Sequence, residues 1–168
     1  MVREVRVLGD PMLRREAKPV AEVGDAVRSL IDDMFDTMYA QEGVGLAAPQ
    51  IGVSERIAVI DPRDEAVAPF AIVNPRVLEA SDEVERGEEG CLSLPGLKDL
   101  VERPIHVVVE ALDREGKPMR IEADGLLARI LQHEIDHLDG VLFIDRVSPL
   151  KRKMLLQKWR KIRPTSAA

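Results

Sequence analysis

Residues 126–138 form the segment that most limits how this chain can fold. Apart from two histidines and a glutamate, its only polar side chains are Arg129, Gln132 and Asp136, which form one stripe on an otherwise apolar helical pattern. Gly140 lies just beyond the end of the pattern, where a left-handed cap forms easily. A helix that is apolar on most sides has to be buried. The sequence therefore predicts a helix near the centre of the fold.

Two further helices are predicted, one on each side of this segment in the sequence. The first runs from Asp25, as its N-cap, to Tyr39. Its apolar residues recur at helical spacing, at Val27, Leu30, Met34 and Met38. The second covers residues 150–162, with a stripe formed by Leu155, Trp159 and Ile162. Both stripes indicate helices that pack one face against the rest of the molecule.

Strands are predicted before the central helix. Runs rich in β-branched and aliphatic residues lie at Arg56–Ile60, Ala71–Leu78, Ile105–Leu112 and Met119–Ala123. Residues 113–116 predict a short hairpin loop between the last two strands. Residues 88–95 contain too many glycine and turn residues to be assigned to a helix or a strand.

The order of these elements predicts one α+β domain covering residues 1–168, with antiparallel or mixed strands packed around the central helix. A length of 168 residues is typical of one domain, and a hydrophobic content of 45% is enough to fill a core. Aromatic residues make up only 3%, so aliphatic side chains must do most of the packing. Residues 151–168 are expected to form a basic C-terminal helix and tail.

Composition predicts a cytoplasmic protein. A single cysteine excludes an intramolecular disulfide and fits a reducing compartment. Residues 1–6 have no continuous apolar region, and no stretch approaches membrane-spanning length. The net charge of −6 argues against nucleic-acid binding by the surface as a whole, and no specific DNA binding is expected.

Two histidines and a glutamate on the central helix predict a metal site. His133 and His137 are four residues apart, so both imidazoles lie on one helix face and reach a single ion. Glu134 projects to one side, where it can accept a proton from water without ligating the metal. A chance pair of core histidines is the plain alternative. Three observations favour the metal site. The two residues are among only three histidines in the chain, both lie on a helix predicted to be buried, and a glutamate stands between them.

A catalytic site of this type usually takes three protein ligands, and the two common peptidase patterns do not supply the third. In the metzincin pattern Gly140 is in place, but Phe143 stands where a third histidine is required. The thermolysin-like pattern needs a glutamate well downstream. Beyond the second histidine the only acids are Asp139 and Asp145, and Gln157 stands near the expected position. The third ligand must therefore lie upstream.

Two upstream residues are candidates for the third ligand. His106 lies within a strand-like run, where it reads as an ordinary half-buried histidine. Cys91 lies in a turn-rich segment that is suited to presenting a side chain into a cleft. A lone cysteine is often no more than a small buried hydrophobe. Beside an incomplete pair of histidine ligands, we favour Cys91 as a thiolate ligand.

Three motifs give the chain a resemblance to a known family. They are Gly43–Gln50 (GVGLAAPQ), Glu89–Ser93 (EGCLS) and Gln132–His137 (QHEIDH), and the opening Asp10–Arg14 also matches. In this order and spacing they resemble the peptide deformylases, over nearly the whole chain. Lys98 is a departure, since many relatives have an arginine there, and it puts one contact to the substrate backbone in doubt.

The resemblance implies a role for each residue of the site. The metal ligands would be Cys91, His133 and His137. Glu134 would be the general base and acid. Gln50 and the backbone N–H of Leu92 would hold the formyl oxygen, where negative charge grows during attack. Without the resemblance, Gln50 reads as a solvated loop residue. The implied substrate-binding residues are Gly43, Val44, Gly45, Gly90, Leu126, Ile130 and His133.

The implied reaction is metal-assisted hydrolysis that removes the formyl group from the N-terminal formylmethionine of nascent peptides and releases formate. One divalent ion is expected, with Fe²⁺ as the ion in the cell, and Zn²⁺, Ni²⁺ or Co²⁺ suit the same donors. Two alternatives stay open. One is a metallopeptidase that cuts internal peptide bonds, and the other is a non-catalytic metal- or redox-sensing module built on the cysteine.

The basic C-terminal helix has two interpretations. Residues 151–163 contain no acid and seven basic residues, namely Lys151, Arg152, Lys153, Lys158, Arg160, Lys161 and Arg163. The helix is either a solvated one that packs through its apolar stripe, or a surface that binds RNA phosphate on the ribosome, where formylated chains emerge.

Overall fold

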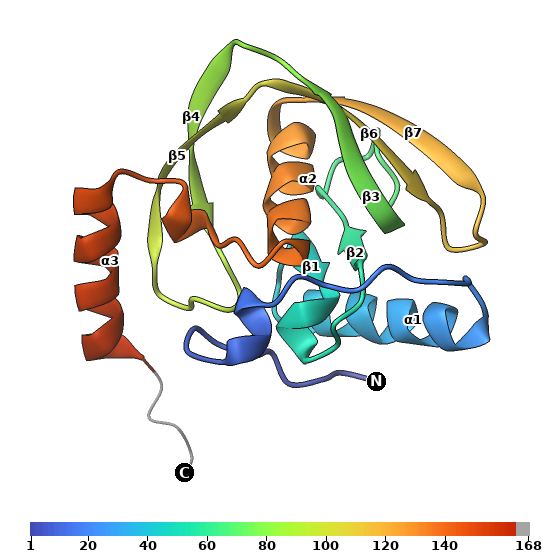
Figure 1. Ribbon diagram of the computed structural model, residues 1–168, viewed down its shortest axis with the longest axis horizontal. Coiled ribbons are helices and arrows are strands. Elements are labelled where there is room, and N and C mark those ends of the chain that lie inside the picture. Colours follow the sequence, from blue (N-terminus) through green and yellow to red (C-terminus); the bar gives the residue numbers. More distant parts are fainter. Residues whose placement is uncertain (164–168) are drawn as a thin grey trace.

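The computed structural model describes residues 1–163, which contain three α-helices, seven strands and three short 3₁₀ turns (Figure 1). The α-helices are α1 (Asp25–Ala40), α2 (Gly125–Leu138) and α3 (Pro149–Ile162). The strands are β1 (Gly45–Ala47), β2 (Ile57–Ile60), β3 (Phe70–Ala80), β4 (Val84–Gly90), β5 (Lys98–Pro104), β6 (His106–Leu112) and β7 (Pro118–Asp124). The turns are η1 (Pro11–Arg14), η2 (Ala48–Ile51) and η3 (Phe143–Asp145). The expected tail at 164–168 lies outside the described residues.

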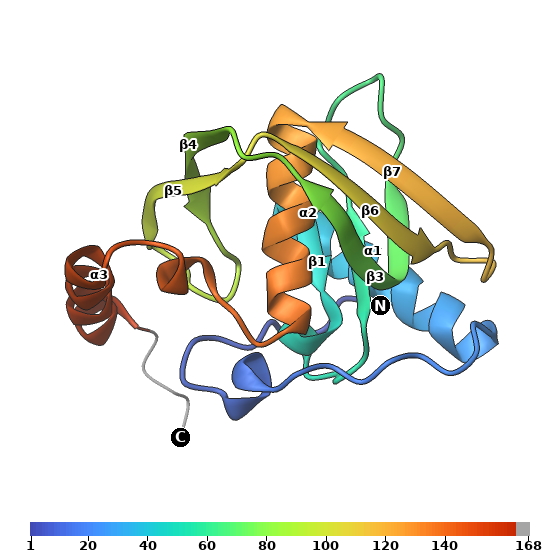
Figure 2. The same cartoon turned by 45° about the horizontal axis from the view of Figure 1, so that its top comes forward.

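The strands form two antiparallel sheets, and α2 runs between them (Figures 1 and 2). The larger sheet has the order β1-β2-β3-β6-β7, so the short β1 is an edge strand paired only with β2. The smaller sheet is the β4–β5 hairpin, which lies on the other side of α2. The fold is therefore the predicted α+β domain around a central helix.

Strand β2 shows how the larger sheet separates two cores. Its side chains alternate, so that Ile57 and Val59 pack with α1, while Ala58 and Ile60 pack with α2. All four residues of the strand are buried. This explains why the strand has a continuous apolar run rather than an alternating pattern. The sheet is covered by one helix on each face at this point.

Helix α2 is buried, as predicted, but its polar stripe does not face solvent. Asp136 is only 9% exposed, and Arg129 and Gln132 are half-buried. Gln132 donates to the carbonyl of Pro104 at 3.0 Å, so it contacts the hairpin. The most exposed apolar residue of the helix is Leu126, at 57%. The polar stripe is therefore a contact surface for the second sheet.

The four predicted strands are present as β2, β3, β6 and β7, with ends displaced by one or two residues. Asp25, predicted as an N-cap, is the first helical residue, and Gly24 is the cap. Strands β1, β4 and β5 were not expected. The hairpin β4–β5 lacks an apolar alternation because two of its buried side chains are charged, Glu89 and Arg103. Part of the unassigned 88–95 segment is thus the end of β4, followed by a turn.

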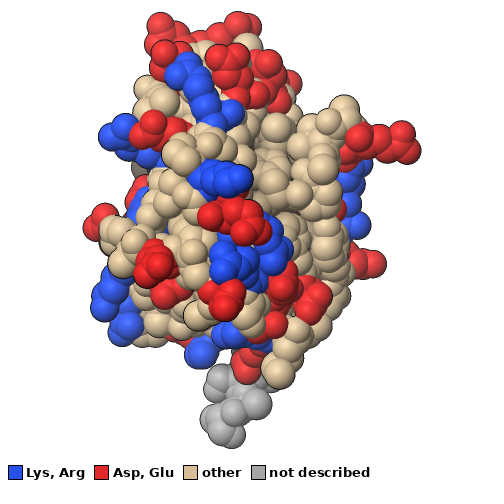
Figure 3. Space-filling view, turned by 90° about the vertical axis from the view of Figure 1, so that its right-hand side faces the viewer, with Lys and Arg blue, Asp and Glu red and all other residues tan. Residues whose placement is uncertain are grey.

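Charged side chains of both signs lie on one face of the molecule. On the face shown in Figure 3, acidic and basic side chains are intermingled, and acidic ones gather along the upper rim. Helix α3 lies on the opposite side of the molecule (Figure 1). No helix among the described residues is both long enough and apolar enough to cross a membrane.

Helix α3 packs on a third core, formed with the turns η1 and η3 and with the segment after β4. Leu155 and Trp159 are buried as the stripe predicted. Ile162, the third residue of the stripe, is 42% exposed because it lies at the edge of this contact, where its Cδ1 approaches Gly96. The side chain of Ser148 caps the helix by accepting from the N–H of Lys151.

Leu155 and Met154 provide a matched test of this packing. Leu155 is 7% exposed and Met154 is 60% exposed. We expect Leu155→Ala to lower the free energy of unfolding by about 2–5 kcal/mol through loss of buried surface and creation of a cavity. Met154→Ala should change it by less than about 0.5 kcal/mol. Urea denaturation measures both, and equal effects would contradict the packing described.

Candidate metal centre

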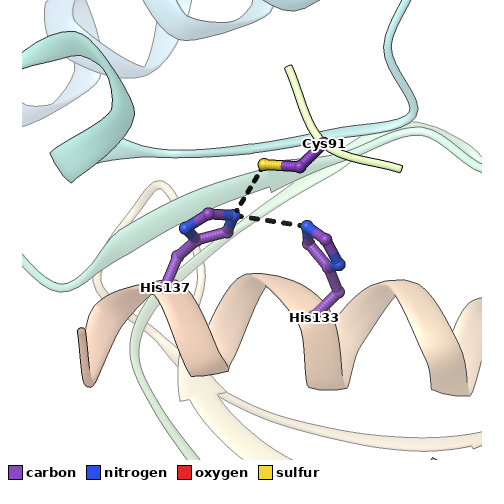
Figure 4. Close-up of side chains that lie close together, drawn as sticks. All are labelled: Cys91, His133 and His137. Atoms are coloured by element: carbon purple, nitrogen blue, oxygen red, sulfur yellow. Dashed lines mark hydrogen bonds between the residues drawn. The ribbon is translucent and has the colours of Figure 1, made fainter. Parts of the chain in front are cut away.

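Three donor side chains converge between α2 and the turn that follows β4 (Figure 4). His133 and His137 project from one face of α2, and Cys91 approaches from the opposite side. The Sγ of Cys91 lies 3.3 Å from Nε2 of His137, which lies 3.2 Å from Nε2 of His133. Their ligand atoms all lie within 4.8 Å of one another. The fold thus brings together the three residues that were predicted as ligands.

His106, the other upstream candidate, lies elsewhere. It begins β6, and its Nδ1 is 2.7 Å from the Asp124 carboxylate at the end of β7. It is not part of the convergent group. Its partner on the neighbouring strand is enough to explain its presence.

The donor set and its spacing fit a transition-metal ion. With bonds of roughly 2.0–2.3 Å, two ligands of a tetrahedral N/S site stand about 3.3–3.6 Å apart. The two contacts at 3.2 and 3.3 Å are close to this separation. Two imidazole nitrogens and a thiolate suit zinc, iron(II), nickel or cobalt. The residues therefore have both the chemistry and the spacing to hold a divalent ion.

Glu89 sets the orientation of His133. Its Oε1 lies 2.9 Å from His133 Nδ1, so this nitrogen donates and Nε2 presents its lone pair to the site. Burial by itself would raise the pKa of Glu89, but hydrogen bonds from Arg103 and His133 outweigh it and lower the pKa to about 2. The carboxylate is therefore a fixed negative charge behind the first histidine.

Glu89 also begins a chain of buried ion pairs. Arg103 binds it through two nitrogens, at 2.7 and 2.9 Å, and Arg129 donates to it at 2.7 Å. Arg103 also donates to Asp136 at 2.9 Å, and Asp136 in turn accepts two bonds from Arg146. These pairs join the hairpin to the helix that carries the histidines. Apart from the polar stripe of α2, no sequence pattern predicted these ion pairs.

Glu134 lies beside the donor group but does not belong to it. It is 4% exposed, and its Oε1 has no hydrogen-bond partner among the described residues. Burial raises its pKa to about 7. A Cβ atom on Gly45 would stand 2.5 Å from Glu134 Oε2. The glycine therefore leaves the space that this carboxyl group occupies.

Gln50 is 2% exposed, so it is not the solvated loop residue that the sequence alone suggested. Its Oε1 accepts from the backbone N–H of Ala47 at 2.9 Å. Its Nε2 donates to Ser93 Oγ at 3.1 Å and contacts Cys91 Sγ at 3.5 Å. The side chain amide thus reaches the donor group from η2.

A cleft of about 420 Å³ opens beside the donor group. The predicted site residues that line it are Gly43, Val44, Gly45, Gln50, Gly90, Cys91, Leu92, Leu126, Ile130, His133 and Glu134. His137 lies behind them at 1% exposure. The cleft is also lined by Lys98, the departure from the family pattern, and by residues that were given no role in the site, namely Glu42, Glu88, Glu89, Leu94, Gly96, Leu97 and Arg129. Several of them are next to predicted residues in the sequence, and Glu89 belongs to a motif, but a motif does not show which of its neighbours face a cleft.

The glycine-rich segment that lines the cleft accepts hydrogen bonds from a loop for which no role was predicted from the sequence. Arg63 donates to the Gly43 carbonyl at 3.0 Å, and the N–H of Asp61 donates to the Val44 carbonyl at 2.9 Å. Tyr39 donates to Asp61 at 2.7 Å, and its ring lies under the Arg63 guanidinium. These contacts fix the approach to the edge strand β1.

Comparisons with known proteins agree on one family. The model of the family described as polypeptide deformylase matches residues 2–153. Peptide deformylase 2 of Vibrio cholerae is 52% identical over 161 residues, covering 95% of each chain. A crystal structure of a peptide deformylase from Legionella pneumophila superposes with a TM-score of 0.90 at 51% identity, covering 96% of this chain and 95% of that one.

A third similar protein is the class I type b peptide deformylase of Acinetobacter baumannii, in a crystal structure with Met-Ala-Ser bound. It has a TM-score of 0.83 and 38% identity, and covers 88% of this chain and 99% of that one. Since the family model covers most of the chain, and its relatives are matched along nearly their whole length, this chain belongs to the polypeptide deformylase family, the hydrolases that remove the formyl group from the N-terminal formylmethionine of polypeptides.

Proposed function

We propose that Cys91, His133 and His137 hold one divalent metal ion and that Glu134 carries the proton transfers of deformylation. The observation that carries this proposal is the convergence of three donor atoms beside a buried carboxyl oxygen that has no partner among the described residues. When bound, the ion polarises the formyl carbonyl and lowers the pKa of a water molecule. Fe²⁺ is the ion we expect in the cell, and Zn²⁺, Ni²⁺ and Co²⁺ suit the same donors.

Glu134 accepts a proton from the attacking water molecule as a C–O bond forms at the formyl carbon. The C–N bond then breaks, and the same carboxyl group returns the proton to the leaving nitrogen. The products are formate and a peptide with a free α-amine. Because Glu134 is almost fully buried, bulk water does not compete for its unpartnered oxygen.

Gln50 and the backbone N–H of Leu92 stabilise the formyl oxygen during this attack. Negative charge grows on that oxygen, and preorganised donors in a site shielded from water stabilise it strongly. Gln50 is suited to this role because its amide nitrogen already faces the donor group, 3.5 Å from Cys91 Sγ. Leu92 follows the cysteine directly and lines the same cleft.

The nascent peptide lies along the edge strand β1. One edge of β1 pairs with β2, and the peptide extends the sheet from the other edge, between Gly43–Gly45 and Gly90. The methionine side chain enters between Val44, Leu126, Ile130 and the ring of His133. Val44 and Leu126 are apolar yet 38% and 57% exposed, as expected for side chains that a ligand covers. The Acinetobacter protein, which has Met-Ala-Ser bound, supports a site that accepts a peptide with an N-terminal methionine.

Residues 1–168 act as one catalytic domain in the cytoplasm, where formylated chains are made. Helix α3 holds this domain near its substrates through ribosomal RNA. Its side chains at Lys153, Lys158, Arg160 and Lys161 are exposed, whereas Leu155 and Trp159 are used for packing. Both interpretations of the helix sequence therefore apply. One face packs against the core, and the basic face binds RNA phosphate.

Substituting the proposed base tests the mechanism. We expect Glu134→Ala to keep its metal and to lose formate release from formyl-Met-Ala by about 10²–10⁴-fold, the usual contribution of general acid–base catalysis. Glu122→Ala, an exposed glutamate on β7, is the control and should match the wild type. A Glu134→Ala enzyme that loses its metal and regains full activity on remetallation would identify Glu134 as a ligand.

Substituting the proposed thiolate tests the ligand set. Cobalt-loaded wild type should have a sulfur-to-metal charge-transfer band in its absorption spectrum. We expect Cys91→Ser to lose this band and to bind metal more weakly, because serine does not supply a thiolate. His106→Ala should keep both the band and the metal. The reverse pattern would assign the third ligand to His106.

Charge removal from α3 tests ribosome contact without disturbing the core. We expect the combined variant Lys153→Gln, Lys158→Gln, Arg160→Gln and Lys161→Gln to retain wild-type turnover of formyl-Met-Ala. Its cosedimentation with ribosomes at low salt should fall to the level of wild type at high salt, since released counterions drive such binding. Lys117→Gln with Arg120→Gln, on the β6–β7 hairpin, is the control. Unchanged cosedimentation of the quadruple variant would leave α3 as a packing element alone.

A further inference from the structure

The carboxamide of Gln50 has only one orientation that satisfies its surroundings. The backbone N–H of Ala47 is a donor and cannot accept, so the Gln50 oxygen must face it at 2.9 Å. The amide nitrogen is then directed to the opposite side, toward Ser93 and Cys91. Both Gln50 and Ser93 are buried, at 2% and 0% exposure. The environment therefore assigns the oxygen and the nitrogen of this amide.

Ser93 is itself held in place through its backbone. Its N–H contacts Cys91 Sγ at 3.4 Å, and its carbonyl accepts from the N–H of Leu8 at 2.9 Å. The hydroxyl group is thus carried by a fixed segment and accepts from Gln50 Nε2 at 3.1 Å. The terminal torsion of a glutamine side chain is broad. The buried hydroxyl group of Ser93 limits the terminal torsion of Gln50 to one orientation.

We propose that Ser93 is a positioning residue for deformylation, which acts by fixing the carboxamide of Gln50. The proposal rests on the role of Gln50 proposed above. One amide hydrogen is retained by Ser93, and the other is directed to the space beside Cys91. The contact in that space, 3.5 Å to Cys91 Sγ, is to a weak acceptor, so a formyl oxygen can replace the sulfur as the acceptor. Without the serine hydroxyl, the amide turns away from this direction.

A double-mutant cycle with Gln50 tests the proposal. We expect Gln50→Ala to lower kcat by about 10²–10³-fold, the usual effect of removing one such donor. Ser93→Ala should lower kcat for formyl-Met-Ala by about 10–100-fold with KM nearly unchanged, because a donor is misplaced rather than removed. In the Gln50→Ala background, Ser93→Ala should have no further effect on kcat.

Two further measurements separate positioning from a general structural effect. The backbone N–H of Ser93 keeps its contact with Cys91 in the alanine variant, so metal content and the cobalt charge-transfer band should match the wild type. Ser81→Ala is the matched control, since it removes a hydroxyl that donates to the Glu83 carbonyl at 2.7 Å, outside the cleft. Its kcat should be unchanged.

Three results would overturn the inference. They are wild-type kcat in Ser93→Ala, an equal loss of kcat when Ser93→Ala is added to Gln50→Ala, and loss of metal or of the cobalt band in Ser93→Ala. Wild-type kcat in Gln50→Ala would instead contradict the role proposed for Gln50. The proposal for Ser93 would then lose its basis as well. The kcat of the Gln50→Ala single variant therefore distinguishes a failure of the Gln50 proposal from a failure of the Ser93 proposal.

Discussion

The arrangement of the whole site depends on the hydrogen bonds that the carboxylate of Glu89 accepts. The two sheets of this fold share no backbone ladder, and a two-stranded hairpin has little stability of its own. Glu89 lies near the end of β4 in that hairpin and accepts hydrogen bonds from Arg103 on the neighbouring strand, from Arg129 on α2, and from His133. One buried group therefore fixes the hairpin, the helix and the tautomer of a proposed ligand. Cys91 follows two residues later, so its position relative to the histidines is set by the same contacts.

A buried charge is stable only if it is paired and its hydrogen-bonding capacity is filled. Glu89 satisfies this condition with four hydrogen bonds from three side chains, and Asp136 satisfies it with Arg103 and Arg146. An apolar contact would hold the hairpin equally well in free energy, but it would not direct a proton to one nitrogen of His133. The ion pairs thus serve orientation more than stability. The same reasoning explains why the hairpin contains charged residues where an apolar alternation would be expected.

The parts of the fold that were predicted from the sequence are those in which apolar residues recur at helical spacing or form a continuous run. The apolar stripes of α1, α2 and α3 and the aliphatic runs of β2, β3, β6 and β7 are of this kind, and the Gly–Val–Gly segment was recognised through its motif. The histidine spacing predicted a shared metal on physical grounds, and the convergence of Cys91 agrees with that hypothesis. Strands β4 and β5 were missed because charged side chains, Glu89 and Arg103, take two of their three buried positions. Ser93, Arg63 and Arg103 were missed because their partners are 43, 20 and 14 residues away in sequence.

The glycines of the cleft show how the family motif and local packing depend on each other. A side chain at Gly45 would overlap the carboxyl group of Glu134, and one at Gly43 would stand 2.9 Å from Leu92. This segment is the proposed peptide-binding edge, and it is also a thin wall against the buried acid. Glycine weakens a strand, because it lacks packing contacts and loses more entropy on folding. Loop contacts from Arg63 and Asp61 to the carbonyls of Gly43 and Val44 offset that weakness from the side away from the cleft. The glycine-rich motif therefore depends on hydrogen bonds from Arg63 and Asp61, which lie outside it in the sequence.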